Sequence, residues 1–313
     1  MIILCPNTEG HYGYYIKLLE KKNKVNSVIS HKDLSFKLIF KELQSEKLLL
    51  LNFWAILKKK PIHYLLIILM SKRIGQFIYN LEFIHKSDLK SKFLFIFFSF
   101  LKHFRSITSF TLVEHDINTS LGLSYIPDPI ELPNQSTNNS DRSNEYNIPE
   151  EYILLFGSHD ERKGTYEFLK FYSMSINVLV VGKIHDLRIL EFSEKKGVYI
   201  INGFVDENLK HVLFEKAKCI AIPYQDWFGS SGVLGTAISY EKVIFGPPHF
   251  FIGNVLKSYN RSIIGSVNDS TSLVNIDNIV IEKLYKESSN SSSILDKYFS
   301  ETTFQNEILS WSH

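Results

Sequence analysis

Short apolar runs alternate with longer helical stretches along most of the chain. The runs that predict buried strands are residues 1–5, 25–29, 48–53, 77–83 and 110–114 in the first half, and residues 152–156, 178–181, 198–201, 219–222 and 243–245 in the second. Because helical stretches separate these runs, we expect parallel sheets with helices on both faces. The pattern predicts an α/β chain of two doubly wound, Rossmann-like domains that face each other across a cleft, with ligands at the carboxyl ends of the strands.

One polar segment divides the chain. Residues 130–150 are rich in Asn and Ser and are bounded by prolines, which is typical of an exposed connection. We expect a first domain over residues 1–133, a linker over 134–150, a second domain over 151–290, and a C-terminal part, residues 291–313, whose helix at 295–311 packs back towards the first domain.

Residues 217–246 combine a strand, a turn, a helix and a second strand in one run. The turn is Gly229-Ser230-Ser231-Gly232, and the helix is expected over residues 233–240. Backbone N–H groups at a helix start have no intrahelical partner and lie at the positive end of the helix dipole. The turn therefore predicts an anion site, with a diphosphate as the candidate, although a simple helix cap by one of the serines explains the same residues.

Composition and cysteine content fit two folded domains in a reducing compartment. The 313 residues, 44% of them hydrophobic, are enough for two domains that each bury a core. Cys5 and Cys219 lie in apolar runs, which indicates buried thiols rather than a disulfide. The first residues enter the first predicted strand without a basic leader, so we expect a cytoplasmic protein.

Charge is unevenly distributed between the two halves. Residues 1–110 hold 18 Lys and Arg against 7 Asp and Glu, a formal charge of +11, and the remaining residues carry −9. Basic residues adjoin the apolar segments 48–57, 64–70 and 93–101, each of which is far shorter than the roughly 20 residues of a spanning helix. These segments predict either core elements or helices that lie on an anionic membrane surface. We expect no nucleic-acid partner.

Five elements of the second half occur in the order found in a known family. They are a strand that runs into Gly157…Lys163-Gly164, a strand that ends in Gly182-Lys183, the element Ile201-Asn202-Gly203-Phe204-Val205, a helix that ends near Ala217, and the run 217–246. In this order and spacing, the second half resembles the donor-binding domain of GT-B glycosyltransferases, particularly the retaining family 4 (glycosyl transferases group 1) of bacterial polysaccharide biosynthesis. The first half resembles the family at Glu9-Gly10-His11-Tyr12-Gly13 and at Tyr125-Ile126-Pro127-Asp128-Pro129.

The resemblance implies that Lys163 contacts the donor diphosphate. A fixed positive charge there stabilises the nucleotide as it departs, whereas a solvated lysine at a helix start is the alternative. Ser158 stands where the family has an arginine, and His159 and Arg162 are close enough in sequence to replace part of that charge.

Other donor-site roles are implied for three further segments. The turn Ser230-Ser231-Gly232 would bind the same phosphates. Gly203 and Phe204 would border the base, unless Phe204 is a core residue. Asp226 stands at the first position of the family's Glu-x7-Glu motif, and the second position falls on Leu234 or Gly235, so no carboxylate of that motif is left for the ribose.

The first half is implied to bind the acceptor and part of the sugar. Gly10 and Gly13 would let the first loop approach the donor phosphates, or they form a simple strand-to-helix turn. His85 and His115 follow predicted strands, where the family places sugar- and acceptor-contacting residues and where local hydrogen bonding is the alternative. With Lys163 and Asp226, they are the candidate catalytic residues. Other polar groups in this half are His11, Glu82, Glu114 and Asp116, and an inverting mechanism would need such a carboxylate as base.

No Asp-x-Asp pair occurs in the chain, which predicts transfer without a metal ion or other cofactor. We expect a glycosyltransferase that moves a hexose-type sugar from a UDP- or GDP-linked donor, with UDP favoured, to a saccharide or polyprenyl-diphosphate-linked glycan. Retention of configuration, a role in cell-surface polysaccharide biosynthesis and peripheral attachment to the inner face of the membrane are part of this expectation. The alternatives are a non-catalytic GT-B partner or binding subunit, and a GT-B epimerase or phosphosugar transferase.

Overall fold

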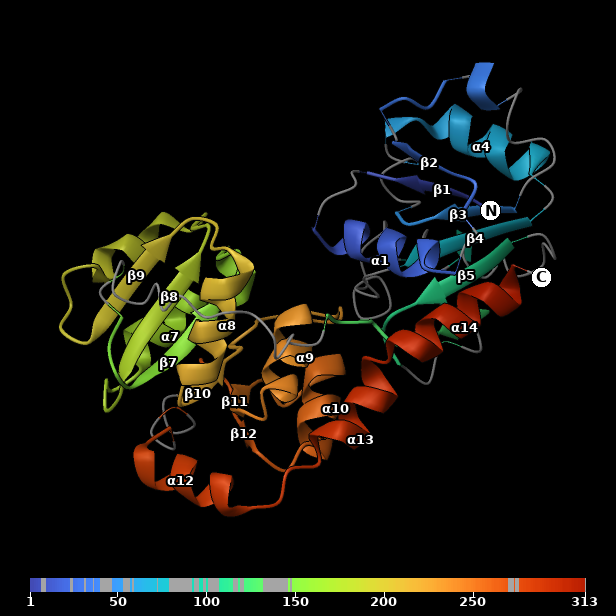
Figure 1. Cartoon of the computed structure of the whole chain (residues 1–313). Helices are drawn as coiled ribbons and strands as arrows, with labels where there is room; N and C mark the ends of the chain where they lie inside the picture. Colours follow the sequence, from blue (N-terminus) through green and yellow to red (C-terminus); the bar gives the residue numbers. More distant parts are fainter. Residues whose placement is uncertain are drawn as a thin grey trace. The chain divides into compact units, whose positions relative to one another are not determined.

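A computed structural model divides the chain into two compact units, each with one six-stranded sheet (Figure 1). The first unit comprises Met1–Pro129, Phe228–Ser230 and Ser300–His313, and the second comprises Ile130–Trp227 and Ser231–Phe299. The structure describes all residues except 7–9, 23–24, 31, 36, 40–46, 53–56, 58, 72, 79–91, 93–95, 98–99, 101–106, 115–117, 119–120, 132–145, 147, 270–272, 274–275 and 313.

The sheet of the first unit has the order β2-β1-β3-β4-β5-β6, and all neighbouring strands are parallel. Its strands are β1 (Ile2–Cys5), β2 (Ser27–Ser30), β3 (Lys47–Leu50), β4 (Arg73–Ile78), β5 (Ile107–Thr111) and β6 (Leu123–Tyr125), and its helices include α1 (Gly10–Glu20) and α4 (Pro61–Met70). Strand β2 lies on one side of β1, and β3 and the later strands lie on the other side. The order in which strands are added therefore reverses between β1 and β3, and the carboxyl ends of these two strands are the switch point of this sheet.

The C-terminal helix α14 (Glu301–Trp311) completes the core of the first unit. The ring centroid of Phe304 lies 5.0 Å from that of Tyr15 on α1. Trp311 meets Phe110 of β5 edge to face, with ring centroids 5.9 Å apart. The first sheet is therefore covered in part by the last residues of the chain, which joins the two ends of the sequence in one core.

The helix expected over residues 295–311 is in fact two helices. The first, α13 (Ser291–Tyr298), belongs to the second unit, and α14 begins after Ser300 in the first. The side-chain oxygen of Ser300 accepts a hydrogen bond from the N–H of Thr303, which caps the new helix start. The apolar spacing alone does not show this break, because apolar residues continue at helical spacing from α13 into α14 and a single serine marks the new helix start.

The sheet of the second unit has the order β12-β11-β10-β7-β8-β9 and is also parallel throughout. Its strands are β7 (Tyr152–Phe156), β8 (Asn177–Gly182), β9 (Val198–Asn202), β10 (Cys219–Ala221), β11 (Val243–Gly246) and β12 (Ser262–Ile264). Numbered within the unit, this is the 3-2-1-4-5-6 order of a Rossmann sheet read from the opposite edge. The order reverses between β7 and β10, and a ligand is expected outside the carboxyl ends of these two strands.

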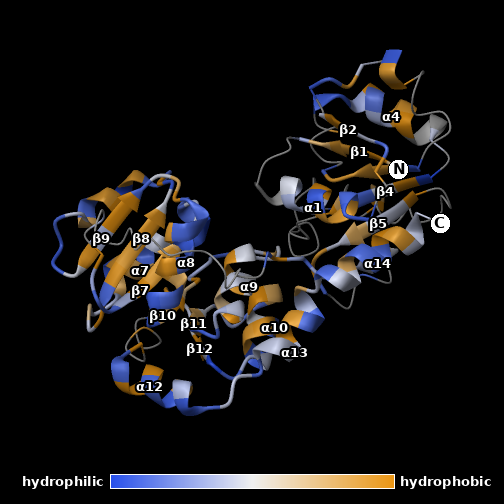
Figure 2. Cartoon of the chain, in the orientation of Figure 1, coloured by the Kyte–Doolittle hydropathy of each residue, from blue (hydrophilic) through white to orange (hydrophobic). Residues whose placement is uncertain are grey.

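Helical segments connect the successive strands of the second unit. The connecting helices are α7 (Thr165–Phe171), α8 (Glu207–Lys216), α9 (Gly232–Ser239) and α10 (Phe250–Ser258), with the 3-10 turns η2 (Glu161–Lys163) before α7 and η3 (Leu187–Phe192) between β8 and β9. The helices α12 (Asn278–Lys286) and α13 follow the last strand. Figure 2 shows mainly apolar colours on the strands of both sheets, as expected for parallel strands covered on both faces. The doubly wound architecture predicted from the sequence is confirmed.

The largest differences from the predicted elements concern short or shifted strands. β6 and β12 each have three residues and contain a serine, so they lack the apolar run that marks the other strands. β4 begins earlier than the predicted strand 77–83, and residues 79–83 lie outside the described part of the chain. Cys5 and Cys219 are buried free thiols, as predicted, and burial raises the pKa of Cys219 to about 12.

Candidate functional site

The loops that follow β7 and β10 touch each other at the switch point of the second sheet. The N–H of Gln225 donates to the carbonyl oxygen of Arg162 at 2.8 Å. A Cβ atom on Gly164, which has a φ of 62°, would lie 2.1 Å from the carbonyl oxygen of Pro223. Only glycine permits this approach, because the backbone of the neighbouring loop occupies the space of any side chain.

A second backbone contact joins the ends of β7 and β8. A Cβ atom on Gly182, which has a φ of 132°, would lie 1.8 Å from the carbonyl oxygen of Gly157. The N–H of Gly157 donates to the carbonyl oxygen of Val181 at 2.9 Å. Gly164 and Gly182, two of the glycines that carry the sequence resemblance, are therefore positions where neighbouring backbone approaches too closely for a side chain.

Two cations from the first loop lie over aromatic rings of the second. The ammonium nitrogen of Lys163 is 3.7 Å from the ring centroid of Tyr224 and 5.9 Å from that of Trp227. The guanidinium carbon of Arg162 is 4.9 Å from the ring centroid of Trp227. Aromatic faces attract cations through their quadrupole, so these contacts orient both side chains.

The charges of Arg162 and Lys163 differ in their electrostatic partners. Arg162 forms an ion pair with Asp160 at 2.6 Å. Within the part of the chain that the structure describes, no carboxylate lies within ion-pair distance of Lys163, whose contacts are with the rings. Lys163 is half-buried and keeps an uncompensated positive charge at the carboxyl edge of the sheet.

The start of α9 lies next to this cation. The side-chain oxygen of Ser231 caps the helix by accepting a hydrogen bond from the N–H of Leu234 at 3.3 Å, and its hydroxyl donates to the hydroxyl of Tyr224 at 3.5 Å. Ser231 is thus a helix cap in this structure, and Gly232 is the first residue of the helix. Ser230 is grouped with the first unit.

His159 is a structural residue and does not supply charge to the site. Its Nε2 donates to the carbonyl oxygen of Val181 at 3.1 Å, and its Nδ1 accepts from the hydroxyl of Thr165 at 2.9 Å. Burial lowers the pKa of His159 to about 4, so the ring is neutral near pH 7. The expectation that His159 replaces part of an arginine's charge is therefore wrong, because both ring nitrogens are used inside the fold.

Phe204 is exposed at the end of β9. Its side chain is 97% exposed, so the alternative that it is a core residue is wrong. Gly203 has a φ of 149° and no atom within 4 Å of a Cβ position, which leaves open space in front of the backbone. Ser158 and Asp226 are also exposed, and Asp226 has a φ of 46°.

Of the first-half candidates, the structure describes only some. Gly10 and Gly13 lie within α1, in its first residues. Glu114 is exposed three residues after the end of β5. His85 and His115, together with Glu82 and Asp116, lie outside the described residues.

The aromatic residues of the site were not predicted from the sequence. Tyr224 and Trp227 lie three and six residues after the end of β10, and an aromatic residue in the loop after a buried strand was the only signal available. Beside the cations, a depression of about 400 Å³ opens between the loops after β7 and β8. Its lining residues are Asp160, Glu161, His185, Asp186, Leu187 and Arg188.

Solved structures with the same architecture cover the whole chain. HepE from Anabaena, in complex with UDP and glucose, matches with a TM-score of 0.72 and 12% identity over 99% of this chain and 98% of its own. Sucrose-phosphate synthase from Thermosynechococcus elongatus matches with a TM-score of 0.70 and 10% identity, over 99% and 97%. The apo structure of OtsA matches with a TM-score of 0.69 and 12% identity, over 100% and 99%. No protein-family model matches the chain, and no curated protein matches its sequence.

These neighbours are GT-B glycosyltransferases. The chain therefore has the GT-B fold, with two α/β domains that each contain a parallel sheet. The fold expected from the sequence resemblance is confirmed.

Proposed function

We propose that the chain is a glycosyltransferase that uses a nucleotide diphosphate sugar and binds the diphosphate at the carboxyl edge of the second sheet. The observation that carries this proposal is the position of Lys163, an uncompensated cation at the switch point between β7 and β10. The start of α9, which is linked to Lys163 through Tyr224, adds the positive end of a helix dipole.

The donor is a UDP-sugar in this proposal, with a GDP-sugar as the second choice. HepE, which shares the fold, has been solved with UDP and with UDP-glucose. In this chain, Gly203 leaves space beside the backbone and Phe204 offers an exposed ring, which suits a base that stacks on the ring and bonds to the backbone. Ser158 and Arg162 are placed at the phosphate end, with the turn from Ser230 to Gly232.

The chemistry needs little more than positioning and charge. An acceptor hydroxyl forms a bond to the anomeric carbon on the face from which the diphosphate leaves, the bond from that carbon to the diphosphate oxygen breaks, and the hydroxyl proton passes to an oxygen of the departing diphosphate. Negative charge then grows on the departing diphosphate, where Lys163 stabilises it. We propose retention of configuration and transfer without a metal ion, and we keep Asp226, His85 and His115 as candidates for contacts to the sugar and the acceptor.

The acceptor is a saccharide or a lipid-linked glycan, and we propose that the first unit meets an anionic membrane surface to reach it. On α4, Ile62 is 63% exposed and Leu65 is 56% exposed, and exposed Lys59 precedes the helix. An apolar face beside basic residues suits the boundary between headgroups and acyl chains. No helix among the described residues is both long and apolar enough to span a bilayer.

The test is direct measurement of sugar transfer and nucleotide release from UDP- and GDP-sugars, with a saccharide and a polyprenyl-diphosphate glycan as acceptors. We expect UDP release that depends on acceptor and persists in a metal chelator. Loss of activity in chelator that Mn²⁺ restores would contradict metal independence. No release from any donor, together with no change in melting temperature on adding UDP or GDP, would contradict the proposed function.

A further inference from the structure

Tyr224 contacts two parts of the proposed phosphate site with two parts of its side chain. The face of its ring lies 3.7 Å from the ammonium nitrogen of Lys163. Its hydroxyl accepts a hydrogen bond from Ser231 at the start of α9. The side chain is only 6% exposed, so the surrounding loops hold the ring in place. One tyrosine therefore joins the cation of the first loop to the helix start of the second.

The partner of Lys163 determines how much charge remains for a ligand. A carboxylate in this place would neutralise the ammonium and compete with a phosphate. An aromatic face attracts the ammonium yet carries no net charge, so the positive charge remains available. It also restricts a long side chain that otherwise loses rotamer freedom when a ligand binds. The tyrosine is thus suited to orienting the lysine before the ligand arrives.

The neighbouring ring has a different role. Trp227 is closer to Arg162 than to Lys163, at 4.9 Å and 5.9 Å from the ring centroid respectively. Arg162 is already paired with Asp160. Of the two rings, Tyr224 is therefore the one that orients the uncompensated cation.

We propose that Tyr224 is a positioning residue that holds the Lys163 ammonium towards the diphosphate of the donor. This inference rests on the proposed function. It predicts that the ring of Tyr224 matters for diphosphate binding more than its hydroxyl does, because the ring contacts the charge directly and the hydroxyl contacts the helix cap.

The binding test compares Tyr224→Leu and Tyr224→Phe by isothermal titration with UDP. We expect Tyr224→Leu to weaken UDP binding roughly tenfold and Tyr224→Phe to weaken it less than threefold. Trp227→Leu serves as the matched control and is expected to have a smaller effect than Tyr224→Leu. Equal UDP affinity in wild type and Tyr224→Leu, or equal losses in the Phe and Leu variants, would overturn the inference.

A second measurement reports on Lys163 without any ligand. Reductive methylation with ¹³C-formaldehyde labels the lysines and keeps their charge, and the NMR signal of Lys163 is assigned by its loss in Lys163→Arg. We expect an upfield ring-current shift of this signal in wild type and Tyr224→Phe, and an ordinary position in Tyr224→Leu. An ordinary position in wild type would overturn the inference even if Tyr224→Leu failed to fold. A wild-type protein that shows the shift but binds neither UDP nor GDP would instead contradict the proposed function.

Discussion

The two ends of the second sheet use positive charge in opposite ways. At the amino ends of β11 and β12, Arg261 donates to the carbonyl oxygens of Glu241 and Glu287, each at 3.0 Å, and forms an ion pair with Glu241 at 3.6 Å. At the carboxyl ends of β7 and β10, Lys163 contacts only aromatic rings among the described residues. The first cation is held by backbone oxygens and a carboxylate of the fold through its two terminal nitrogens, whereas the second is available to a ligand.

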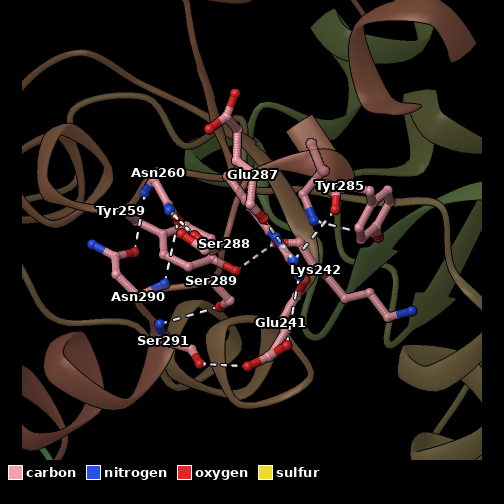
Figure 3. A network of polar contacts seen from close by, with 12 residues as sticks. Glu241, Lys242, Tyr259, Asn260, Tyr285, Glu287, Ser288, Ser289, Asn290 and Ser291 are labelled. Atoms are coloured by element: carbon pink, nitrogen blue, oxygen red, sulfur yellow. Dashed lines mark hydrogen bonds and ion pairs between the residues drawn. The ribbon is translucent and has the colours of Figure 1, made fainter. Parts of the chain in front are cut away.

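The polar network around Arg261 extends the contrast. Asn290 donates through its side chain to the carbonyl oxygen of Ser258 at 2.7 Å. Ser291 donates to the Glu241 carboxylate at 2.8 Å (Figure 3). Asn260 bonds to the carbonyl oxygen of Ser288. These bonds tie the loops before β11, β12 and α13 together, so this end of the sheet contributes stability. A charge that is satisfied by backbone groups marks a structural site, and one that is not marks a candidate binding site.

The largest effect is expected from removing the available charge. Lys163→Met should lower the rate of sugar transfer by about 10²- to 10³-fold, because it removes the positive charge that lies at the switch point between β7 and β10. The free energy of unfolding should change by less than about 0.5 kcal/mol. The matched control is Lys170→Met, since Lys170 is exposed and also lies over an aromatic ring, 5.1 Å from the centroid of Phe171. Equal transfer rates in Lys163→Met and Lys170→Met would show that Lys163 has no special role in sugar transfer.

Removing the structural cation should have the opposite result. Arg261 is only 13% exposed in its side chain, and its loss removes the donors to the carbonyl oxygens of Glu241 and Glu287. Arg261→Met should lower the free energy of unfolding by about 2 kcal/mol, measured by urea denaturation. UDP affinity of the folded protein should not change. Lys210→Met, which breaks the surface ion pair with Glu207, is the control and should cost less than about 0.5 kcal/mol.

His159, at the carboxyl end of the second sheet, makes the free energy of unfolding depend on pH. The folded state holds this histidine neutral by burial, with a pKa of about 4 against an ordinary value of 6.5, while Asp160 raises this pKa and Lys163 lowers it. The associated stability is complete above about pH 6.5 and is lost as the pH falls towards 4. Between pH 7 and pH 5, the loss should be about 2 kcal/mol. Denaturation at both pH values should show a smaller loss in His159→Gln, and an equal loss would contradict the assignment.

The smallest effect is expected at Phe204. Because its side chain is almost fully exposed, Phe204→Ala should leave the melting temperature unchanged and weaken UDP binding by roughly tenfold through lost stacking. Phe171→Ala, at another exposed phenylalanine, should leave UDP affinity unchanged. A fall in melting temperature without a change in affinity would place Phe204 outside the site.

Sequence periodicity was sufficient for the two parallel sheets, because buried parallel strands are continuous apolar runs. It missed β6 and β12, where three residues pair at a sheet edge and include serine. The order of glycines and Lys163 pointed to the switch point of the second sheet. The contact between Lys163 and Tyr224 was not predictable, because it depends on how two loops pack that lie far apart in the sequence.

His159 shows the same limit. In the sequence it is a histidine three residues after a strand, which suits a charged role. In the fold, the ring is buried and donates to the carbonyl oxygen of Val181, which belongs to β8 and not to the loop of His159. Residue type and spacing suggested charge, and tertiary packing determined that the ring is neutral.

Lys163 is the cation by which the carboxyl edge of the second sheet is proposed to bind a nucleoside diphosphate. This role is tested by isothermal titration of wild type and Lys163→Met with UDP and GDP. We expect wild type to bind at least one of the two nucleotides and Lys163→Met to bind it at least tenfold more weakly. Binding of equal affinity in the variant, or no binding of either nucleotide to wild type, would contradict it.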